Sequence, residues 1–222
     1  MTAPRDAEIR WQLHRHERIA EVDAAAWNAQ FDPAYPFTRH EFLRALEDHG
    51  CAVARQGWQP CHATLESTDG ELLAAAPLYL KQHSYGEFVF DWVWAEASQR
   101  IGAPYYPKLL CALPFTPSQG PRLGARNAPA RQALARALTE LPAQDGVSSL
   151  HVLFSNETDR SALMSPGALS RCDVQFHWHN RGYTDFEDFL AQLTAEKRKK
   201  ILRERRRIAE SGLRFEVIPG NQ

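Results

Sequence analysis

The sequence lacks several features that would assign its class at once. Its four cysteines stand apart, without the CxxC spacing of zinc sites and redox motifs. No apolar run reaches the length of a transmembrane helix, and the first residues carry charges where a signal peptide would be apolar. Basic residues (26) and acidic residues (27) nearly cancel, so no global charge selects a partner. We therefore expect a cytoplasmic protein with reduced cysteines, no metal and no membrane span.

The residues that are present predict a folded α+β protein. A chain of 222 residues with 44% hydrophobic residues is long enough for a real core. Two helical patterns are followed by two strand-like runs, and Asp69–Gly70 between these runs is typical of a hairpin turn. Thr38 and Glu41 have the spacing of a capping box at the start of the second helix. The expected elements are a strand at 8–16, helices at 19–31 and 38–49, and strands at 58–66 and 72–81.

The second half predicts a strand, a glycine-containing loop and a helix. Residues 109–115 have strand character, residues 116–127 form the loop, and Asn127 is suited to cap the helix that follows. Free backbone N–H groups at such a junction can hold an anion, although this signal alone is weak. The later elements expected are a strand at 148–154, a helix at 159–169, and strands at 173–180 and 213–218.

Residues 78–123 combine aromatic side chains, scattered polar groups and prolines. Eight aromatic residues lie between Tyr79 and Tyr106, and five prolines follow in the second half of the stretch. Aromatic rings line pockets well, and prolines fix the backbone beside them. We interpret the stretch as the wall of a cleft, and the alternative is a Trp- and Phe-rich core segment with satisfied polar groups.

A long helix is predicted at residues 185–211, with a second capping box at Thr184 and Glu187. Eight of the thirteen residues from Ala195 to Arg207 are basic, a density that favours binding of a polyanion. The alternative is a solvated surface helix with some Glu–Lys pairs. Just before it, His177 and His179 share one face of the predicted strand; a polar wall beside a pocket is favoured there over a metal site, since no third ligand is close in sequence.

Five blocks of the chain resemble a known group of proteins. They are SYGEFVFDWVWAEA (84–97), YYPKLL (105–110), PFTPSQGPRL (114–123), QFHWHNRGY (175–183) and KRKKILRERRR (197–207). With them the chain resembles the bacterial Fem-like N-acyltransferases of the GNAT superfamily, which are linked to peptidoglycan biosynthesis, from Trp27 onward. The resemblance implies a GNAT-like lobe with a central, mostly antiparallel sheet flanked by helices. The 116–127 loop departs from the GNAT pattern for coenzyme A.

The resemblance also implies a domain organisation and an activity. Residues 1–183 would form the first lobe, 184–212 a basic connecting helix, and 213–222 the start of a second lobe. The activity implied is acyl or aminoacyl transfer to an amine, with a coenzyme A thioester or an aminoacyl-tRNA as donor. The acceptor would be an anionic or carrier-linked substrate of the peptidoglycan-precursor type. The partners expected are therefore this substrate, tRNA and the second lobe.

Candidate site residues follow from the same interpretation. Catalytic candidates are Glu87, Asp91 and His177. Candidate substrate-binding residues are Tyr85, Tyr106, Lys108 and Arg122, and candidate phosphate-binding residues are Lys197, Arg198, Arg203 and Arg206. Two other hypotheses remain open at this stage: a non-catalytic nucleic-acid-binding module that uses the basic helix, and a structural lobe that only docks on its partner lobe.

Overall fold

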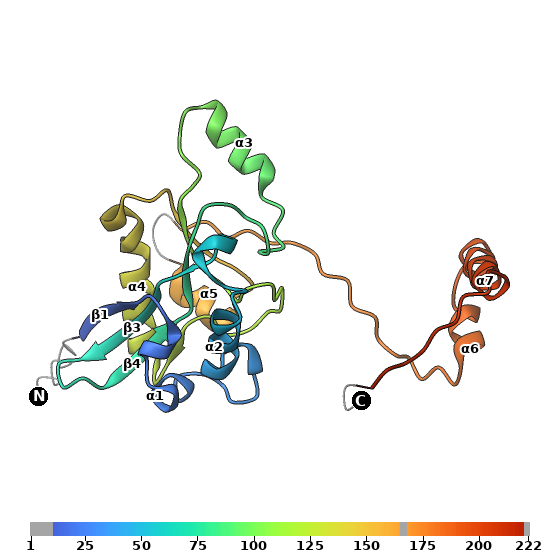
Figure 1. Cartoon of the computed structure of the whole chain (residues 1–222), viewed down its shortest axis with the longest axis horizontal. Coiled ribbons are helices and arrows are strands. Elements are labelled where there is room, and N and C mark those ends of the chain that lie inside the picture. Colours follow the sequence, from blue (N-terminus) through green and yellow to red (C-terminus); the bar gives the residue numbers. More distant parts are fainter. Residues whose placement is uncertain (1–10, 165–167, 220–222) are drawn as a thin grey trace, which may run out of the picture. The chain divides into compact units, whose positions relative to one another are not determined.

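The computed structural model describes residues 11–164 and 168–219 of the chain (Figure 1). These residues fall into two compact units, one ending at Ser170 and one beginning at Arg171, and each is described by itself. The first unit contains β1 (Trp11–His16), α1 (Ala24–Asn28), α2 (His40–Asp48), β2 (Gln59–Pro60), β3 (His62–Ser67), β4 (Leu72–Ala76), β5 (Leu78–Lys81), α3 (Trp92–Arg100), β6 (Lys108–Cys111), β7 (Gly124–Ala125), α4 (Ala128–Asp145), β8 (Leu150–Val152) and α5 (Glu157–Leu163). The second contains α6 (Phe186–Ala191) and α7 (Ala195–Glu210).

The described residues confirm a mixed α+β chain, with two four-stranded sheets in place of the single central sheet expected. One sheet has the strand order β1-β3-β4-β7 and is antiparallel throughout. The other has the order β2-β5-β6-β8, in which β6 and β8 run parallel. Pro77 lies between β4 and β5, where the chain leaves one sheet and enters the other. A proline cannot donate a ladder hydrogen bond, so this position suits the change of sheet.

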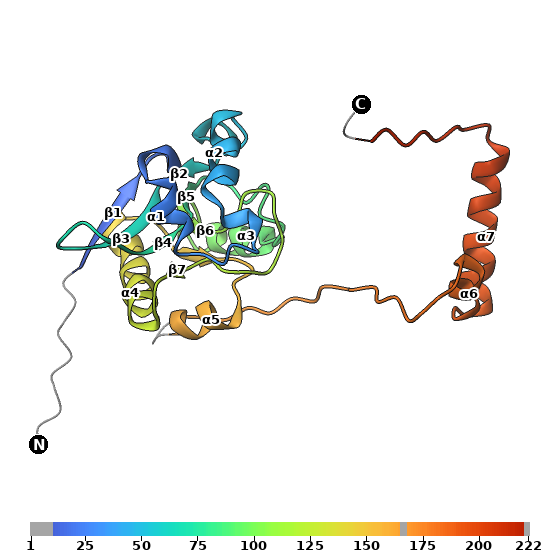
Figure 2. The same cartoon turned by 90° about the horizontal axis from the view of Figure 1, so that it is seen from below.

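Helix α4 packs against both sheets and builds the largest core (Figure 2). Asn127 begins the helix as predicted, because its side chain accepts a hydrogen bond from the backbone N–H of Ala130 at 2.9 Å. The buried face of α4 includes Leu134, Leu138 and Leu141. These side chains join a cluster with leucines of β3, β5 and β6, and each buried leucine contributes about 1.5–3 kcal/mol.

Several local expectations differ from the structure. Residues 173–180 and 213–218 form no strand in the part of the chain described, because alternation makes a strand only where a partner strand supplies hydrogen bonds. Thr38 lies in a short 3₁₀ helix and does not cap α2, while the Glu41 carboxylate accepts hydrogen bonds from Asn28. The predicted strand at 8–16 and the predicted helix at 159–169 include residues 8–10 and 165–167, and these residues lie outside the described part of the chain.

The predicted long C-terminal helix is two helices, α6 and α7. Thr194 ends the intervening turn, and its side chain caps α7 by accepting from Lys197 N at 3.5 Å. Arg198 donates to the carbonyls of Leu190, Ala191 and Leu193 and so satisfies the open end of α6. Helix α6 is capped by Asp185, whose side chain accepts from Asp188 N, and not by the predicted capping box of Thr184 and Glu187. Local capping therefore overrides the continuous helical pattern.

Candidate functional site

Two lysines lie side by side at the edge of the second sheet. Lys81 is the last residue of β5, Lys108 is the first residue of β6, and the antiparallel register pairs them directly. Both side chains are fully buried. Like charges at paired positions repel each other, and a buried charge is costly without a partner. The sheet therefore requires carboxylates at this point.

The loop after β5 supplies these carboxylates. The Lys108 ammonium donates three hydrogen bonds: to Ser84 Oγ at 2.8 Å, Glu87 Oε2 at 2.9 Å and Asp91 Oδ2 at 2.8 Å. All three N–H groups of the ammonium are thereby used. The loop residues are themselves buried, so the pairs lie away from water. We call Lys81, Lys108, Ser84, Glu87 and Asp91 the buried charge cluster.

Lys81 is held more loosely than Lys108. Its Nζ donates to the backbone carbonyl of Tyr85 at 3.2 Å and lies 4.0 Å from Glu87 Oε1. It also lies 3.7 Å from the centroid of the buried Trp58 ring, which is a cation–π contact. Lys81 thus has one neutral hydrogen-bond acceptor and a more distant carboxylate, whereas Lys108 donates to two carboxylates directly.

Aromatic hydroxyls complete the surroundings of the cluster. Tyr105 donates from its hydroxyl to Asp91 Oδ2 at 2.7 Å, and the hydroxyls of Tyr106 and Ser84 lie 2.7 Å apart. The ring of His151, on β8, meets Tyr105 edge-on with 5.7 Å between centroids. Residues from β5, β6, β8 and the intervening loop therefore converge on one place.

Burial and charge shift the pKa values in this cluster in different directions. Burial alone would raise the pKa of Asp91, but hydrogen bonds from Lys108 and Tyr105 outweigh it and lower the pKa to about 2. Burial raises the pKa of Glu87 despite Lys108. Burial lowers the pKa of Lys81 to about 8, against the opposing effect of Glu87. Burial and the charge of Lys108 lower the pKa of His151 to about 4.

The segment that carries Glu87 and Asp91 also carries exposed aromatic side chains. Helix α3 has no buried residue and projects from the body of the first unit (Figure 1). Tyr85 is 66% exposed and contacts the cluster only through its carbonyl. The other exposed large apolar side chains of this segment are Phe88, Phe90, Trp92, Val93, Trp94 and Ile101. The aromatic residues of the stretch thus lie mainly on the surface, and its acidic residues Glu87 and Asp91 are buried.

The structure brings together four of the candidate site residues. Glu87, Asp91 and Lys108 are in direct contact, and Tyr106 joins them through Ser84. Arg122 lies elsewhere, fully buried, and donates to the carbonyls of Ser118 and Pro121. His177 belongs to the second unit, where it is exposed and stacks on His179 with 6.3 Å between centroids.

The loop expected to cradle an anion already holds a carboxylate of the chain itself. Asp159 Oδ2 accepts hydrogen bonds from the backbone N–H groups of Arg122 at 2.6 Å and Leu123 at 3.1 Å. Asp159 Oδ1 lies 3.3 Å from Arg131 Nε. These N–H groups are the ones that a phosphate would need. The expectation of an anion cradle at residues 116–127 is therefore corrected in this structure.

The basic residues of α7 do not all have the same surroundings. Arg198 is engaged with the end of α6, and Arg205 Cζ lies 4.4 Å from the centroid of the Phe186 ring. Lys197, Arg203 and Arg206 are exposed. Within the described ranges, no carboxylate comes within 4.0 Å of these three side chains. We call these exposed cations the open basic surface of α7, in which Arg203 and Arg206 share one side of the helix and Lys197 lies on the other side.

Sequence reasoning missed four residues around the cluster, namely Lys81, Ser84, Tyr105 and His151. In the sequence Lys81 looks like the polar end of an apolar strand, and the structure buries it together with Leu78 and Tyr79. What pattern alone does not show is the cross-strand register that pairs Lys81 with Lys108.

Among the described residues, no three His, Cys, Asp or Glu side chains are grouped so as to hold a metal ion. None of their helices combines the length and the apolar character needed to cross a bilayer.

The sequence was also compared with known proteins. Residues 18–222 match the model of a family described as peptidoglycan biosynthesis/recognition. No curated protein and no solved structure matches the chain significantly.

Proposed function

This chain belongs to the FemAB-like family of peptidoglycan biosynthesis and recognition, and we propose that it takes part in transferring an acyl or aminoacyl group to an amine of a peptidoglycan-type precursor. The observation that carries the proposal is the buried charge cluster, in which Lys81 has a pKa lowered to about 8. A lysine with such a pKa can accept a proton near neutral pH.

The chemistry of the transfer assigns a role to each member of the cluster. The acceptor amine attacks the carbonyl carbon of the donor, a C–N bond forms, and the C–S bond of a thioester or the C–O bond of an ester breaks. The amine gives up one proton, which neutral Lys81 takes, and the resulting Lys81 ammonium then gives a proton to the leaving thiolate or alkoxide. Lys108, fixed by Glu87 and Asp91, keeps a positive charge close by that favours the developing oxyanion.

Access to Lys81 requires the covering loop to move. The ammonium is fully buried, and the loop that covers it continues into α3, which has no buried residue. A segment with few buried apolar contacts is the kind that opens most readily. In this proposal the loop opens at Tyr85, whose carbonyl accepts from Lys81, while Glu87 and Asp91 keep their hydrogen bonds to Lys108.

We assign the first unit to a GNAT-like fold. Supporting this assignment, β6 and β8 are parallel and joined through α4, with the antiparallel β5 on the other side of β6. The donor is a coenzyme A thioester or an aminoacyl-tRNA. Since Asp159 accepts from the N–H groups of Arg122 and Leu123 in the loop before α4, we place the donor's phosphates at another site.

The test compares the natural chain with Lys81→Arg and, as a control at an exposed surface cation, Arg100→Gln. Arginine keeps the charge but does not deprotonate in this pH range. Product is measured by mass spectrometry with an amine-bearing peptide as acceptor and either donor class. We expect the natural rate to rise with pH through about 8. We expect the rate of product formation by Lys81→Arg to be roughly 100- to 10,000-fold lower, which is the usual contribution of a general base.

Two results would count against different parts of the proposal. An unchanged rate and pH profile in Lys81→Arg would remove Lys81 as the base while leaving the transfer intact. The absence of product with both donor classes would refute the transfer itself. Thermal unfolding of each variant, measured in parallel, shows whether a lost rate reflects lost folding.

A second candidate function is non-catalytic binding of a nucleic acid. The observation that favours it is the open basic surface of α7, where Lys197, Arg203 and Arg206 are exposed and without a nearby carboxylate among the described residues. Side chains in this state are free to neutralise phosphates. Salt dependence of binding separates this function from acyl transfer.

A further inference from the structure

A buried hydrogen-bond donor without an acceptor lies beside the buried charge cluster. Within the described ranges, six buried side-chain N or O atoms have no hydrogen-bond partner, and all six belong to the first unit. Trp58 and Tyr79 are the two residues among them whose only polar side-chain atom is unpartnered. Of the two, Trp58 contacts the cluster, because Lys81 Nζ lies 3.7 Å from the centroid of its ring. An unpaired buried N–H is costly, so its presence here requires an explanation.

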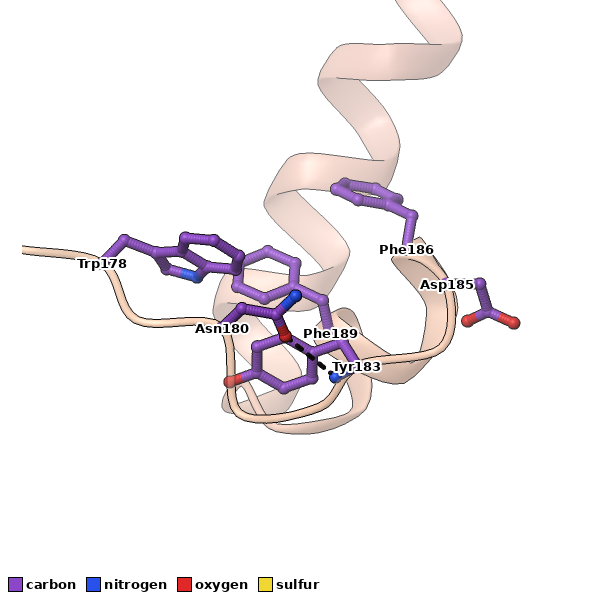
Figure 3. Close-up of a pocket in the computed structure, with 6 residues that line it drawn as sticks. All are labelled: Trp178, Asn180, Tyr183, Asp185, Phe186 and Phe189. Atoms are coloured by element: carbon purple, nitrogen blue, oxygen red, sulfur yellow. Dashed lines mark hydrogen bonds between the residues drawn. The ribbon is translucent and has the colours of Figure 1, made fainter.

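The aromatic pocket of the second unit contains no comparable atom. Figure 3 shows its rings together with Asn180 and Asp185. The rings, the Asp185 carboxylate and the Tyr183 hydroxyl favour different ligands. None of the six unpartnered buried atoms of the described residues belongs to this pocket. The N–H of Trp58, in contrast, requires one kind of group, which is a hydrogen-bond acceptor.

A second tryptophan of the first unit shows how the chain satisfies a buried indole. Trp27 is fully buried, as Trp58 is. Its Nε1 donates to the backbone carbonyl of Thr38 at 2.8 Å. The chain thus supplies an acceptor to one buried indole and leaves the other unpaired next to Lys81. This pair of tryptophans also provides a matched control.

The residue that faces Trp58 Nε1 is Gly86, in the loop after β5. A Cβ atom on Gly86 would lie 3.1 Å from Trp58 Nε1 and 2.7 Å from the Phe115 ring, so only glycine fits there. Gly86 also has a φ of +81°, which residues with a side chain rarely adopt. The preceding residue, Tyr85, accepts from Lys81 Nζ through its carbonyl at 3.2 Å. The same turn of the loop therefore covers the Lys81 ammonium and the Trp58 N–H.

Acyl transfer needs a base and an oxyanion donor side by side. The attacking nitrogen and the developing oxyanion are attached to the same carbon atom. The group that takes the proton and the group that donates to the oxyanion must therefore lie close together. Lys81 and Trp58 meet this condition through their 3.7 Å contact. If the loop opens at Tyr85 and Gly86, both groups are uncovered by one movement.

Lys108 does not have a hydrogen bond left for the oxyanion. All three N–H groups of its ammonium donate to Ser84, Glu87 and Asp91. Lys108 therefore acts on the oxyanion through its charge alone. A direct hydrogen bond requires a donor that is still free, and among the described residues the Trp58 N–H is such a donor.

We propose that Trp58 is a catalytic residue, whose Nε1–H donates a hydrogen bond to the oxyanion of the acyl group once the loop has opened. This inference rests on the transfer proposed above, in which Lys81 takes the proton of the attacking amine. It adds the group that holds the carbonyl oxygen. The unpaired N–H of the closed loop is then a donor kept ready for the transition state, which is where such a hydrogen bond lowers the barrier.

The experiment replaces the indole N–H by sulfur at one position of the full chain at a time. Benzothienylalanine has the shape of tryptophan and lacks the N–H donor. The variants are Trp58→benzothienylalanine and, as the control, Trp27→benzothienylalanine. Product is measured by mass spectrometry with an amine-bearing peptide as acceptor and either donor class, which gives kcat, KM and the pH profile. Urea unfolding followed by circular dichroism gives the stability of each variant.

We expect Trp58→benzothienylalanine to lower kcat roughly 100- to 1,000-fold, the usual effect of removing one oxyanion donor, and to leave KM unchanged. Its urea midpoint should equal that of the natural chain, because the lost N–H has no partner among the described residues. Trp27→benzothienylalanine should show the opposite, with the natural kcat and a lower urea midpoint, because the Thr38 carbonyl loses its donor. The pH dependence of the rate should be the same in both variants, since each keeps the ring beside Lys81.

Four results would overturn the proposal, and they differ in what else they remove. A natural kcat in the position 58 variant excludes Trp58 as a donor and leaves the transfer intact. A shifted pH profile in this variant shows that Trp58 acts through Lys81 and not on the oxyanion. Equal losses of kcat in the two variants assign the effect to the fold. The absence of product from the natural chain with both donor classes refutes the transfer and this role of Trp58 with it.

Discussion

Replacing Lys108 by methionine tests the energetics of the buried charge cluster. The change removes one cation and three hydrogen bonds while keeping an unbranched side chain of similar length. It leaves Glu87 and Asp91, which are 3% and 2% exposed, with only Lys81 as a nearby cation, 4.0 Å from Glu87 Oε1. Removing one partner of a buried ion pair usually costs about 3–5 kcal/mol, because the other charge stays buried. We expect the free energy of unfolding of Lys108→Met to fall by an amount in that range.

The matched control is Arg100→Met on the surface of α3. Arg100 and Glu96 also form a close ion pair, at 2.6 Å, but their side chains are 74% and 61% exposed. Pairs of this kind contribute about 0–1 kcal/mol. The two substitutions thus remove cations that have carboxylate partners but differ in burial. The difference between their losses in free energy of unfolding measures the effect of burial.

Urea unfolding followed by tryptophan fluorescence is the assay. Trp27 and Trp58 are fully buried in the first unit and report on its unfolding. With a slope of about 1–3 kcal/mol per molar urea, the loss expected for Lys108→Met lowers the midpoint by at least about 1 M. Adding Asp91→Asn should restore part of the loss, since Asp91 then carries no unpaired buried charge and Glu87 keeps Lys81 as a neighbouring cation. A free energy of unfolding within about 1 kcal/mol of the natural chain would refute this reasoning.

Two other predictions concern pH and salt. The pKa of His151 is lowered to about 4 from its ordinary value of 6.5, so the unfolded chain binds more protons between these values, and stability falls as pH falls from 6.5 to 4. His151→Gln should lose less stability than the natural chain between pH 7 and 4.5 in urea unfolding, and an equal loss would contradict this. For α7, the triple change of Lys197, Arg203 and Arg206 to glutamine should reduce the slope of log affinity against log salt for single-stranded RNA by up to about 2. The control Arg100→Gln should leave the slope unchanged, and an unchanged slope in the triple variant would exclude these three contacts.

Sequence reasoning located the features that depend on neighbours in the chain. The Asp69–Gly70 turn joins β3 and β4, and Asn127 caps α4. In each case the physical cause lies within a few residues, so a short window contains the whole signal. Glu87, Asp91 and Lys108 also stood out as polar residues in an aromatic stretch.

What the sequence did not show depends on contacts between distant residues. Lys81 and Lys108 become neighbours only through the register of β5 and β6. Asp159 reaches the 116–127 loop from a helix some 35 residues later. Residues 173–180 alternate as a strand would, yet a strand forms only where another strand offers its backbone, and alternation does not say whether one is present.

The change of sheet at Pro77 has a consequence for how the first unit comes apart. Residues 72–81 supply β4 to one sheet and β5 to the other, and α4 covers both. If the inner strand of one sheet unpairs, the inner strand of the other sheet is displaced as well, because the two strands are joined directly through Pro77. The slowest-exchanging amide hydrogens of the two sheets should therefore open together, as one cooperative unit held by a ten-residue run of chain.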